Sequence, residues 1–199
     1  MKRITEKQER ALGVKLFVKA DRCNSPKCVM VRRPSRPGQH GERRQTKTDY
    51  GKQLMEKQKI QWYFGLTDRQ MRRIFAEPSP QAIRETLEHR LDQVVFQLGL
   101  AKSPRIARQL VNHGHILVNG RRSSVASHLL RPGDAVSIRP ESRDSKQFEE
   151  LSERLKEFTP PTWLKLNTDT MSGNVFATST TSDTNFPFDI TVVSQFYAR

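Results

Sequence analysis

The sequence predicts an α+β protein made of a discontinuous, mainly helical domain with a C-terminal β segment, an inserted module of two helices and a β-hairpin, and a basic N-terminal extension. Three observations predict this fold. Helical periodicity dominates the first half of the chain after a basic start, short alternating apolar segments dominate the second half, and charge is unevenly distributed. The predicted boundaries are 1–48 for the extension, 49–89 and 144–199 for the discontinuous domain, and 90–143 for the module.

The extension is too polar to fold by itself. Residues 1–50 contain 14 basic and 5 acidic side chains, and Pro, Gly and Arg are concentrated between residues 32 and 44. Such a segment cannot bury enough apolar surface to offset the entropy lost on folding. We therefore expect it to become ordered only when it contacts a polyanion.

Three helices are predicted after the extension. The first covers residues 49–63. The second begins at Thr67, which forms a capping-box pattern with Gln70, and it ends before Pro78 and Pro80. A third helix is predicted from an apolar stripe at helical spacing. The stripe consists of Leu87, Leu91, Val94, Val95 and Leu98.

A short helix with two different faces is predicted for residues 104–113. Ser103 is a favourable N-cap, Pro104 suits the first helical position, and Gly114 suits the left-handed residue that ends a helix. At 100° per residue, apolar and polar side chains separate onto opposite faces. The expected apolar face holds Ile106, Ala107, Leu110 and Val111, and the opposite face holds Arg105, Arg108 and Asn112.

A basic β-hairpin is predicted directly after this helix. Residues 115–118 form its first strand, and Asn119 and Gly120 form the two-residue turn, because both residues tolerate positive φ. Arg121 and Arg122 then lie beside the turn. A strand at residues 135–139, which follows a turn, is expected to close a small sheet.

The C-terminal segment is predicted to be a helix at residues 145–158 followed by short strands. The expected strands are residues 163–166, 175–178 and 189–197. This tail is expected to return to the helices of residues 50–89, which would make the module an insertion. The Ser- and Thr-rich stretch at 172–184 is expected to be a surface turn.

The charge points to a polyanionic partner. The chain has 35 Lys and Arg against 21 Asp and Glu, a net charge of +14. No long apolar run, amphipathic lysine helix or lipidation motif favours a membrane. A basic helix face, a basic hairpin tip and two nearby histidines favour RNA. The first residues lack the apolar core of a signal peptide, and two cysteines make no disulfide framework, so a cytosol-like compartment is expected.

The candidate site consists of RNA contacts, and no catalytic residue is predicted. No phosphate-cradling glycine loop or nucleophile elbow occurs, and His113 and His115 do not have the i, i+4 spacing of helical metal ligands. The expected RNA-binding residues are Arg32, Arg33, Arg36, Gln39, His40, Arg43, Arg44, Lys47, Lys57, Lys59, Arg69, Arg72, Arg73, Arg105, Arg108, Asn112, His113, His115, Arg121 and Arg122.

Several segments, spread over nearly the whole chain, resemble the bacterial-type family of small-subunit ribosomal protein number four. They are residues 32–41, 56–59, 63–66, 90–95, 113–120, 131–134, 161–164 and 196–199. The resemblance implies a non-enzymatic protein that binds small-subunit (16S) ribosomal RNA, holds a multi-helix junction, nucleates assembly of the subunit body and contributes to translational accuracy. It also implies contact with small-subunit protein number five and other neighbours, and a place near the channel through which messenger RNA enters.

The resemblance also exposes a departure at the cysteines. Some members of the family carry four N-terminal cysteines that bind zinc, and Cys23 and Cys28 look like the second pair. Glu6 and Glu9 stand where the first pair would fall. Because a structural zinc ordinarily takes four nitrogen or sulfur ligands, we expect no metal and no other cofactor.

Two alternatives remain beside the ribosomal interpretation. One is an RNA-modifying enzyme, and the other is an RNA chaperone for stalled ribosomes, because both classes can carry the same small module. The first needs a separate catalytic domain, and the second does not need the long extension. Neither a membrane nor a homo-oligomer is expected, and the compartment is bacterial cytosol or the stroma or matrix of a bacterial-derived organelle.

Overall fold

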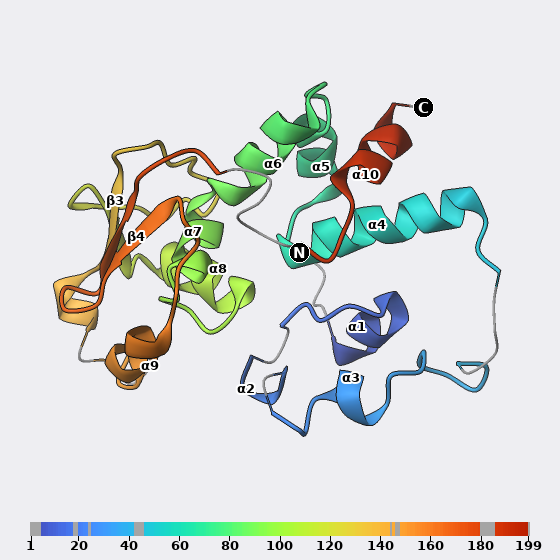
Figure 1. Cartoon of the computed structure of the whole chain (residues 1–199), viewed down its shortest axis with the longest axis horizontal. Coiled ribbons are helices and arrows are strands. Elements are labelled where there is room, and N and C mark those ends of the chain that lie inside the picture. Colours follow the sequence, from blue (N-terminus) through green and yellow to red (C-terminus); the bar gives the residue numbers. More distant parts are fainter. Residues whose placement is uncertain are drawn as a thin grey trace. The chain divides into compact units, whose positions relative to one another are not determined.

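The computed structural model describes residues 5–17, 20–23, 25–41, 46–143, 145, 148–179 and 186–198. The chain divides into two compact units (Figure 1). The first unit is Met1–Arg84 with Phe186–Arg199, and the second unit is Glu85–Asn185. The first unit is helical in its described residues, whereas the second combines helices with a sheet, so the fold is of the predicted α+β class.

The described part of the extension contains three short helices, α1 (Glu6–Leu12), α2 (Ala20–Cys23) and α3 (Val29–Arg32). Helix α1 begins with a capping box, in which the Thr5 N–H donates to Gln8 Oε1 at 2.6 Å. The buried side chains of the extension include Glu9, Leu12, Leu16, Cys23 and Cys28. The described residues of the extension therefore form short helices that bury a few of its side chains.

The rest of the first unit consists of α4 (Asp49–Tyr63), α5 (Asp68–Ile74) and α10 (Ile190–Tyr197). The predicted bounds of α4 are confirmed. The predicted capping box of α5 is also confirmed, since Thr67 Oγ1 accepts from Gln70 N at 3.3 Å and Gln70 Oε1 accepts from Thr67 N at 2.9 Å.

The predicted strand at residues 189–197 is wrong, because these residues form helix α10. Asp189 is its N-cap, and its carboxylate accepts from Thr191 N at 2.8 Å. The ring of Tyr197 stacks on Phe75 with centroids 5.4 Å apart. The β-branched, aromatic composition of the segment suggested a strand, but the cap and the packing of one helical face determine its conformation.

The predicted third helix is two helices, α6 (Pro80–Glu88) and α7 (Leu91–Gln97). Arg90 separates them with an extended backbone, ψ 138°. The break lets Leu91 N donate to His128 O at 2.8 Å. The five residues of the predicted apolar stripe are all buried, as expected. Helical periodicity continues across the break and therefore does not reveal it.

The second unit contains α8 (Pro104–His113), α9 (Leu151–Glu157) and one antiparallel sheet in the order β2-β1-β3-β5-β4. The strands are β1 (Ile116–Val118), β2 (Arg121–Arg122), β3 (Ala135–Ile138), β4 (Leu164–Asn167) and β5 (Ser172–Val175). Helix α9 is shorter than expected, and β5 begins three residues before the expected strand at 175–178, inside the Ser- and Thr-rich stretch.

The structure divides the chain differently from the predicted boundaries. Residues 144–199 were expected to return together to the helices of residues 50–89, but β5 pairs with β3, and only the segment that contains α10 belongs to the first unit. Gly173 of β5 lies close to Leu98, the residue after α7. A Cβ at Gly173 would lie 2.3 Å from Leu98 Cδ2, so a side chain there would force Leu98 to shift.

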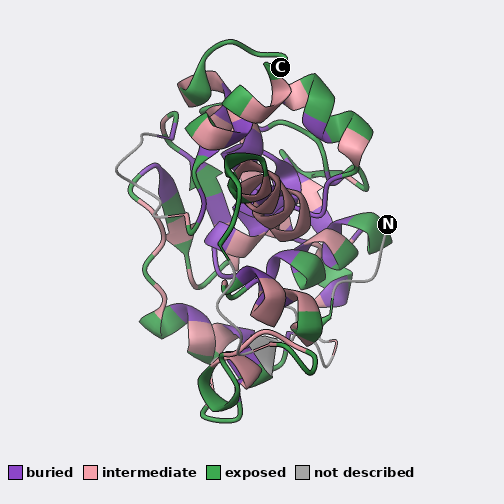
Figure 2. Cartoon of the chain, turned by 90° about the vertical axis from the view of Figure 1, so that its right-hand side faces the viewer, coloured by how far each residue is buried: buried purple, intermediate pink, exposed green. Residues whose placement is uncertain are grey.

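The core of the second unit lies between the sheet and helices α7, α8 and α9. Trp163, Phe148, Leu91, Leu98, Leu100, Ile116, Ile138 and Leu151 are its largest fully buried side chains. Figure 2 shows buried and exposed bands alternating along single helices, as amphipathic helices require. Within the described residues, no helix is both long and apolar enough to span a membrane.

Candidate RNA-binding surface

Helix α8 is bounded by the three residues that the sequence indicated. Ser103 Oγ accepts from Ile106 N at 3.2 Å, Pro104 occupies the first turn, and Gly114 has φ 77°. Ala107, Leu110 and Val111 are buried, but Ile106, predicted on the same face, is 36% exposed. It lies at the edge of the apolar arc, so the buried face is narrower than expected. Arg105 and Asn112 are exposed on the opposite side.

The Ser103 cap is expected to stabilise this surface. Ser103→Ala should lower the free energy of unfolding of the second unit by about 1 kcal/mol, because one N-terminal N–H loses its acceptor. Urea denaturation followed by circular dichroism measures the change. Ser124→Ala, at an exposed serine in the same unit, is the matched control and should leave stability unchanged. Equal effects of the two substitutions would contradict a capping role.

The hairpin turn has the predicted conformation, with φ 51° at Asn119 and 77° at Gly120. Arg121 is exposed at the edge of the sheet. Arg122 is exposed as well, and its Nη2 donates to His113 O at 3.3 Å. A side chain at Gly114 would collide with the Arg122 guanidinium, 2.1 Å from Nε. Arg122 therefore lies across the C-terminal end of α8 and ties the hairpin to the helix, in addition to its predicted role toward RNA.

The two histidines lie in this cationic region. The rings of His113 and His115 are 6.1 Å apart, and His115 Nδ1 contacts Ser142 Oγ at 2.9 Å. Burial lowers the pKa of His115 below its ordinary value of 6.5. The positive charges of His113, Arg139 and Arg122 lower it further. The neutral imidazole is thus favoured in the folded protein.

This shift predicts a pH dependence of stability. The folded pKa of His115 lies below the unfolded value, so the unfolded chain binds the proton more strongly. The free energy of unfolding should therefore fall as pH decreases from about 6.5 toward the folded pKa. Urea denaturation at several pH values, for the natural chain and His115→Gln, measures this effect. A pH profile that is identical in the two proteins would contradict it.

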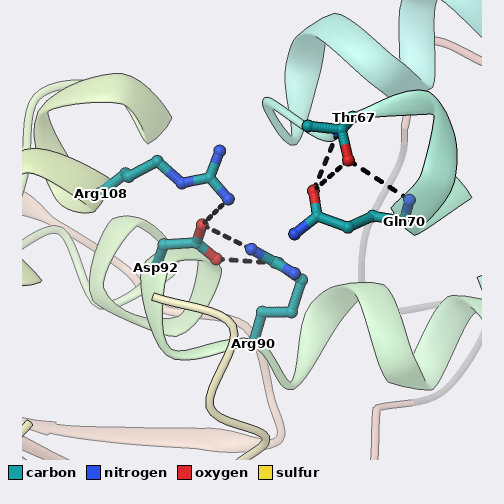
Figure 3. A network of polar contacts seen from close by, with 5 residues as sticks. All are labelled: Thr67, Gln70, Arg90, Asp92 and Arg108. Carbon is teal, nitrogen blue, oxygen red and sulfur yellow. Dashed lines mark hydrogen bonds and ion pairs between the residues drawn. The ribbon is translucent and has the colours of Figure 1, made fainter. Parts of the chain in front are cut away.

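Arg108 of α8 belongs to a charged network with Arg90 and Asp92, two residues that the site prediction missed (Figure 3). Arg90 donates to both oxygens of Asp92, from Nε at 3.1 Å and from Nη2 at 3.0 Å, and Arg108 Nη2 contacts Asp92 Oδ2 at 3.1 Å. Arg108 is thus partly engaged within the protein. The sequence contained a signal, since Arg90 and Asp92 lie in one of the family-like segments, but spacing alone did not connect them to Arg108.

In the first unit, α5 presents Arg69, Arg72 and Arg73 on an exposed surface. Arg72 Nε contacts Asp68 Oδ2 at 3.2 Å, yet its side chain remains 75% exposed. Such a surface ion pair contributes little stability, so the guanidinium can exchange partners at small cost. All three arginines are therefore placed where a phosphate backbone can reach them.

Lys57 and Lys59, by contrast, have partners within the protein. Lys57 forms an ion pair with Asp68 and lies 5.6 Å from the centre of the Phe196 ring. The hydrogen bond from Lys57 holds the pKa of the Asp68 carboxyl below its usual value. Lys59 contacts Glu56 at 2.5 Å. These contacts give both lysines a structural role that the sequence did not predict.

The extension contributes exposed polar side chains before α4. Partial loss of hydration lowers the pKa of Lys47, and the positive charges of Arg36 and Lys59 lower it further. The predicted RNA-binding residues of the extension that are exposed are Arg32, Arg33, Gln39, His40 and Lys47. Arg43 and Arg44 lie outside the described residues.

The residues near the cysteines do not fit a zinc ion. Cys23 and Cys28 are both buried, and neither is in a disulfide among the described residues. Glu9 accepts a backbone hydrogen bond at 2.9 Å, and Glu6 forms an ion pair with an arginine. Among the described residues, no group of three or more His, Cys, Asp or Glu side chains could hold a metal. The donor set offers two thiols where a structural zinc takes four ligands.

The chain is similar to known proteins over nearly its whole length. Residues 1–98 match the family described as "Ribosomal protein S4/S9 N-terminal domain", and residues 89–136 match the "S4 domain". The small ribosomal subunit protein uS4 of Halothermothrix orenii is 44% identical over 193 residues, which cover 94% of this chain and 93% of the relative. The proteins of the same name from Gloeobacter violaceus and Thermus thermophilus are each 42% identical. Their alignments cover 96% and 94% of this chain, and 94% and 93% of the respective relatives.

Proposed function

Since this chain belongs to the family of small ribosomal subunit protein uS4, we propose that it is a structural protein of the small ribosomal subunit that binds rRNA and holds a multi-helix junction of the small-subunit (16S) rRNA together. The family is not enzymatic, and the alternative of an RNA-modifying enzyme is not supported. In this proposal the protein binds and scaffolds rRNA and catalyses no reaction.

The observation that carries this proposal is the joined surface of α8 and the hairpin. Arg122 of the hairpin donates to the carbonyl of His113 at the end of α8, so the two elements are in contact. Arg105, Asn112 and Arg121 are exposed on this surface. A surface that presents several guanidinium groups suits an RNA backbone, because each group can form charge-assisted hydrogen bonds with phosphate oxygens.

The remaining cations extend the proposed contact to other parts of the RNA. The exposed arginines of α5 and those of the extension belong to the first unit, whereas α8 and the hairpin belong to the second. A protein with basic surfaces on both units can bring several RNA helices together, because its charges offset the repulsion between their phosphates. This property would let it bind early and nucleate assembly of the subunit body.

We also propose the finer partners that the family resemblance implies. These are small-subunit protein number five and other neighbours in the subunit body, and messenger RNA near the channel through which it enters, with an effect on translational accuracy. The charge of the C-terminal segment supports a protein-facing side, since residues 144–199 contain 5 basic and 8 acidic side chains. The proposed location is the ribosome, in bacterial cytosol or a bacterial-derived organelle.

Sedimentation of a tagged chain through a sucrose gradient tests this function. Expressed in cells, the tagged chain should migrate with the small subunit, and it should stay there at a salt concentration that strips weakly bound proteins. The Arg105→Ala/Arg121→Ala variant is the matched comparison and should show reduced occupancy. A tagged chain that remains at the top of the gradient would contradict a structural role in the subunit.

A further inference from the structure

We propose that Asp92 is a positioning residue for RNA binding, which holds the guanidinium of Arg108 in one orientation on the RNA-facing side of α8. The proposal rests on the proposed function, because it assumes that the second unit contacts rRNA. Asp92 is a buried acid beside the basic face of α8. Its negative charge by itself would repel RNA phosphates.

The three side chains of this network differ in how far they reach the surface. The Arg90 and Asp92 side chains are 4% and 7% exposed, whereas the Arg108 side chain is 19% exposed. Arg90 satisfies both carboxylate oxygens, and Arg108 shares one of them. Arg108 is therefore the member that can touch a ligand, and the other two act through it.

Backbone hydrogen bonds hold the segment that carries the Asp92 carboxylate. Asp92 N donates to Ala126 O at 3.2 Å, and the preceding Leu91 N donates to His128 O at 2.8 Å. Asp92 also lies in the first turn of α7, where a negative charge is favourable. Because the acid cannot move freely, the guanidinium that it binds loses fewer orientations when RNA arrives, which reduces the entropy cost of binding.

The charge of the network determines in which direction Asp92→Asn should change RNA affinity. Arg90 neutralises Asp92, so the network carries one net positive charge, and its exposed member is a cation. If Asp92 acted only through its charge, Asp92→Asn would strengthen RNA binding, because an acid near phosphates is removed. If Asp92 positions Arg108, the same substitution weakens RNA binding despite the added net positive charge.

The experiment is a double-mutant cycle on the full chain. The dissociation constant is measured by filter binding with full-length small-subunit rRNA transcribed in vitro, at a fixed salt concentration. Asp92→Asn should weaken binding about tenfold, which is the scale of one charge-assisted hydrogen bond. In an Arg108→Ala background the substitution should have little further effect. In an Arg105→Ala background it should keep its full effect, because Arg105 lies on the same helix but forms no hydrogen bond or ion pair with Asp92.

A second variant covers the case in which Asp92→Asn does not fold. Removing the acid alone leaves two guanidinium groups without their carboxylate, which is strongly destabilising in a buried site. Arg90→Met/Asp92→Leu removes the buried pair together and replaces it with apolar side chains of similar size, which buried ion pairs tolerate. Circular dichroism verifies that this variant is folded, and its affinity should fall as far as that of Arg108→Ala.

The outcomes separate this proposal from the proposed function. Binding by Asp92→Asn that equals or exceeds that of the natural chain would overturn the proposal, as would a loss that persists undiminished without Arg108. In both cases the natural chain would still prefer rRNA to an unrelated structured RNA. A natural chain that shows no such preference would overturn the proposed function itself, and this proposal with it.

Discussion

Replacing Trp163 by alanine is expected to lower the free energy of unfolding of the second unit by about 3–5 kcal/mol, the usual cost of deleting a buried tryptophan. The side chain is 2% exposed, and its ring stacks on His89 with centroids 4.8 Å apart. His89 in turn contacts Leu130 O through Nδ1 at 3.0 Å and accepts from Ser179 N through Nε2 at 3.2 Å. Loss of the indole would remove the surface against which this imidazole packs.

Urea denaturation followed by circular dichroism measures the effect. Phe176→Ala is the matched control, because Phe176 follows the adjacent strand and is 63% exposed. Its substitution should change stability by no more than about 0.5 kcal/mol. Trp163→Phe keeps an aromatic ring in the core and should be milder than Trp163→Ala. If Trp163→Ala cost no more than Phe176→Ala, the assignment of Trp163 to the core would be wrong.

The Arg105→Ala/Arg121→Ala variant is expected to show the largest loss of RNA affinity at little cost in stability. Both arginines are exposed, and neither forms an ion pair with another described residue. Each would neutralise one phosphate and release a counterion, so the salt slope of log K against log salt should decrease by roughly 1.4 to 1.8 for the two together. Affinity near 0.1 M salt should decrease on the order of tenfold to a hundredfold.

Filter binding at several salt concentrations measures both quantities. Lys156→Ala/Lys165→Ala is the charge-matched control, because both lysines are exposed in the same unit but on α9 and β4. It removes the same net charge away from α8 and the hairpin and should change the salt slope much less. Equal slopes for the two double variants would show that net charge, and not this surface, determines binding.

The local elements of the second unit could be predicted from sequence because their signals are short-range. Ser103, Gly114 and the Asn119-Gly120 turn act within a few residues, and the structure has helix α8 and the hairpin where these residues place them. The strand pairing of the tail could not be predicted in the same way. β5 pairs with β3, and Gly173 of β5 lies close to Leu98; both contacts join residues that are far apart in the sequence.

In the candidate site, too, local features could be predicted from the sequence and long-range contacts could not. Exposed arginines such as Arg105 and Arg121 could be assigned from helical angle and turn position, because each points away from a recognisable apolar face. The internal partners of Lys57, Lys59 and Arg108 could not, since each partner is identified only when the chain is folded. Counting positive charge therefore overstates the number of side chains that are available to RNA.

The measurement that tests the central claim most directly is a filter-binding titration of the full chain against full-length small-subunit rRNA, with an unrelated structured RNA as competitor, at several salt concentrations. We expect tight binding that persists in the presence of the competitor and weakens steeply as salt increases. Equal affinity for both RNAs would contradict the account, because it would leave only a general cationic binder without specificity for the rRNA junction.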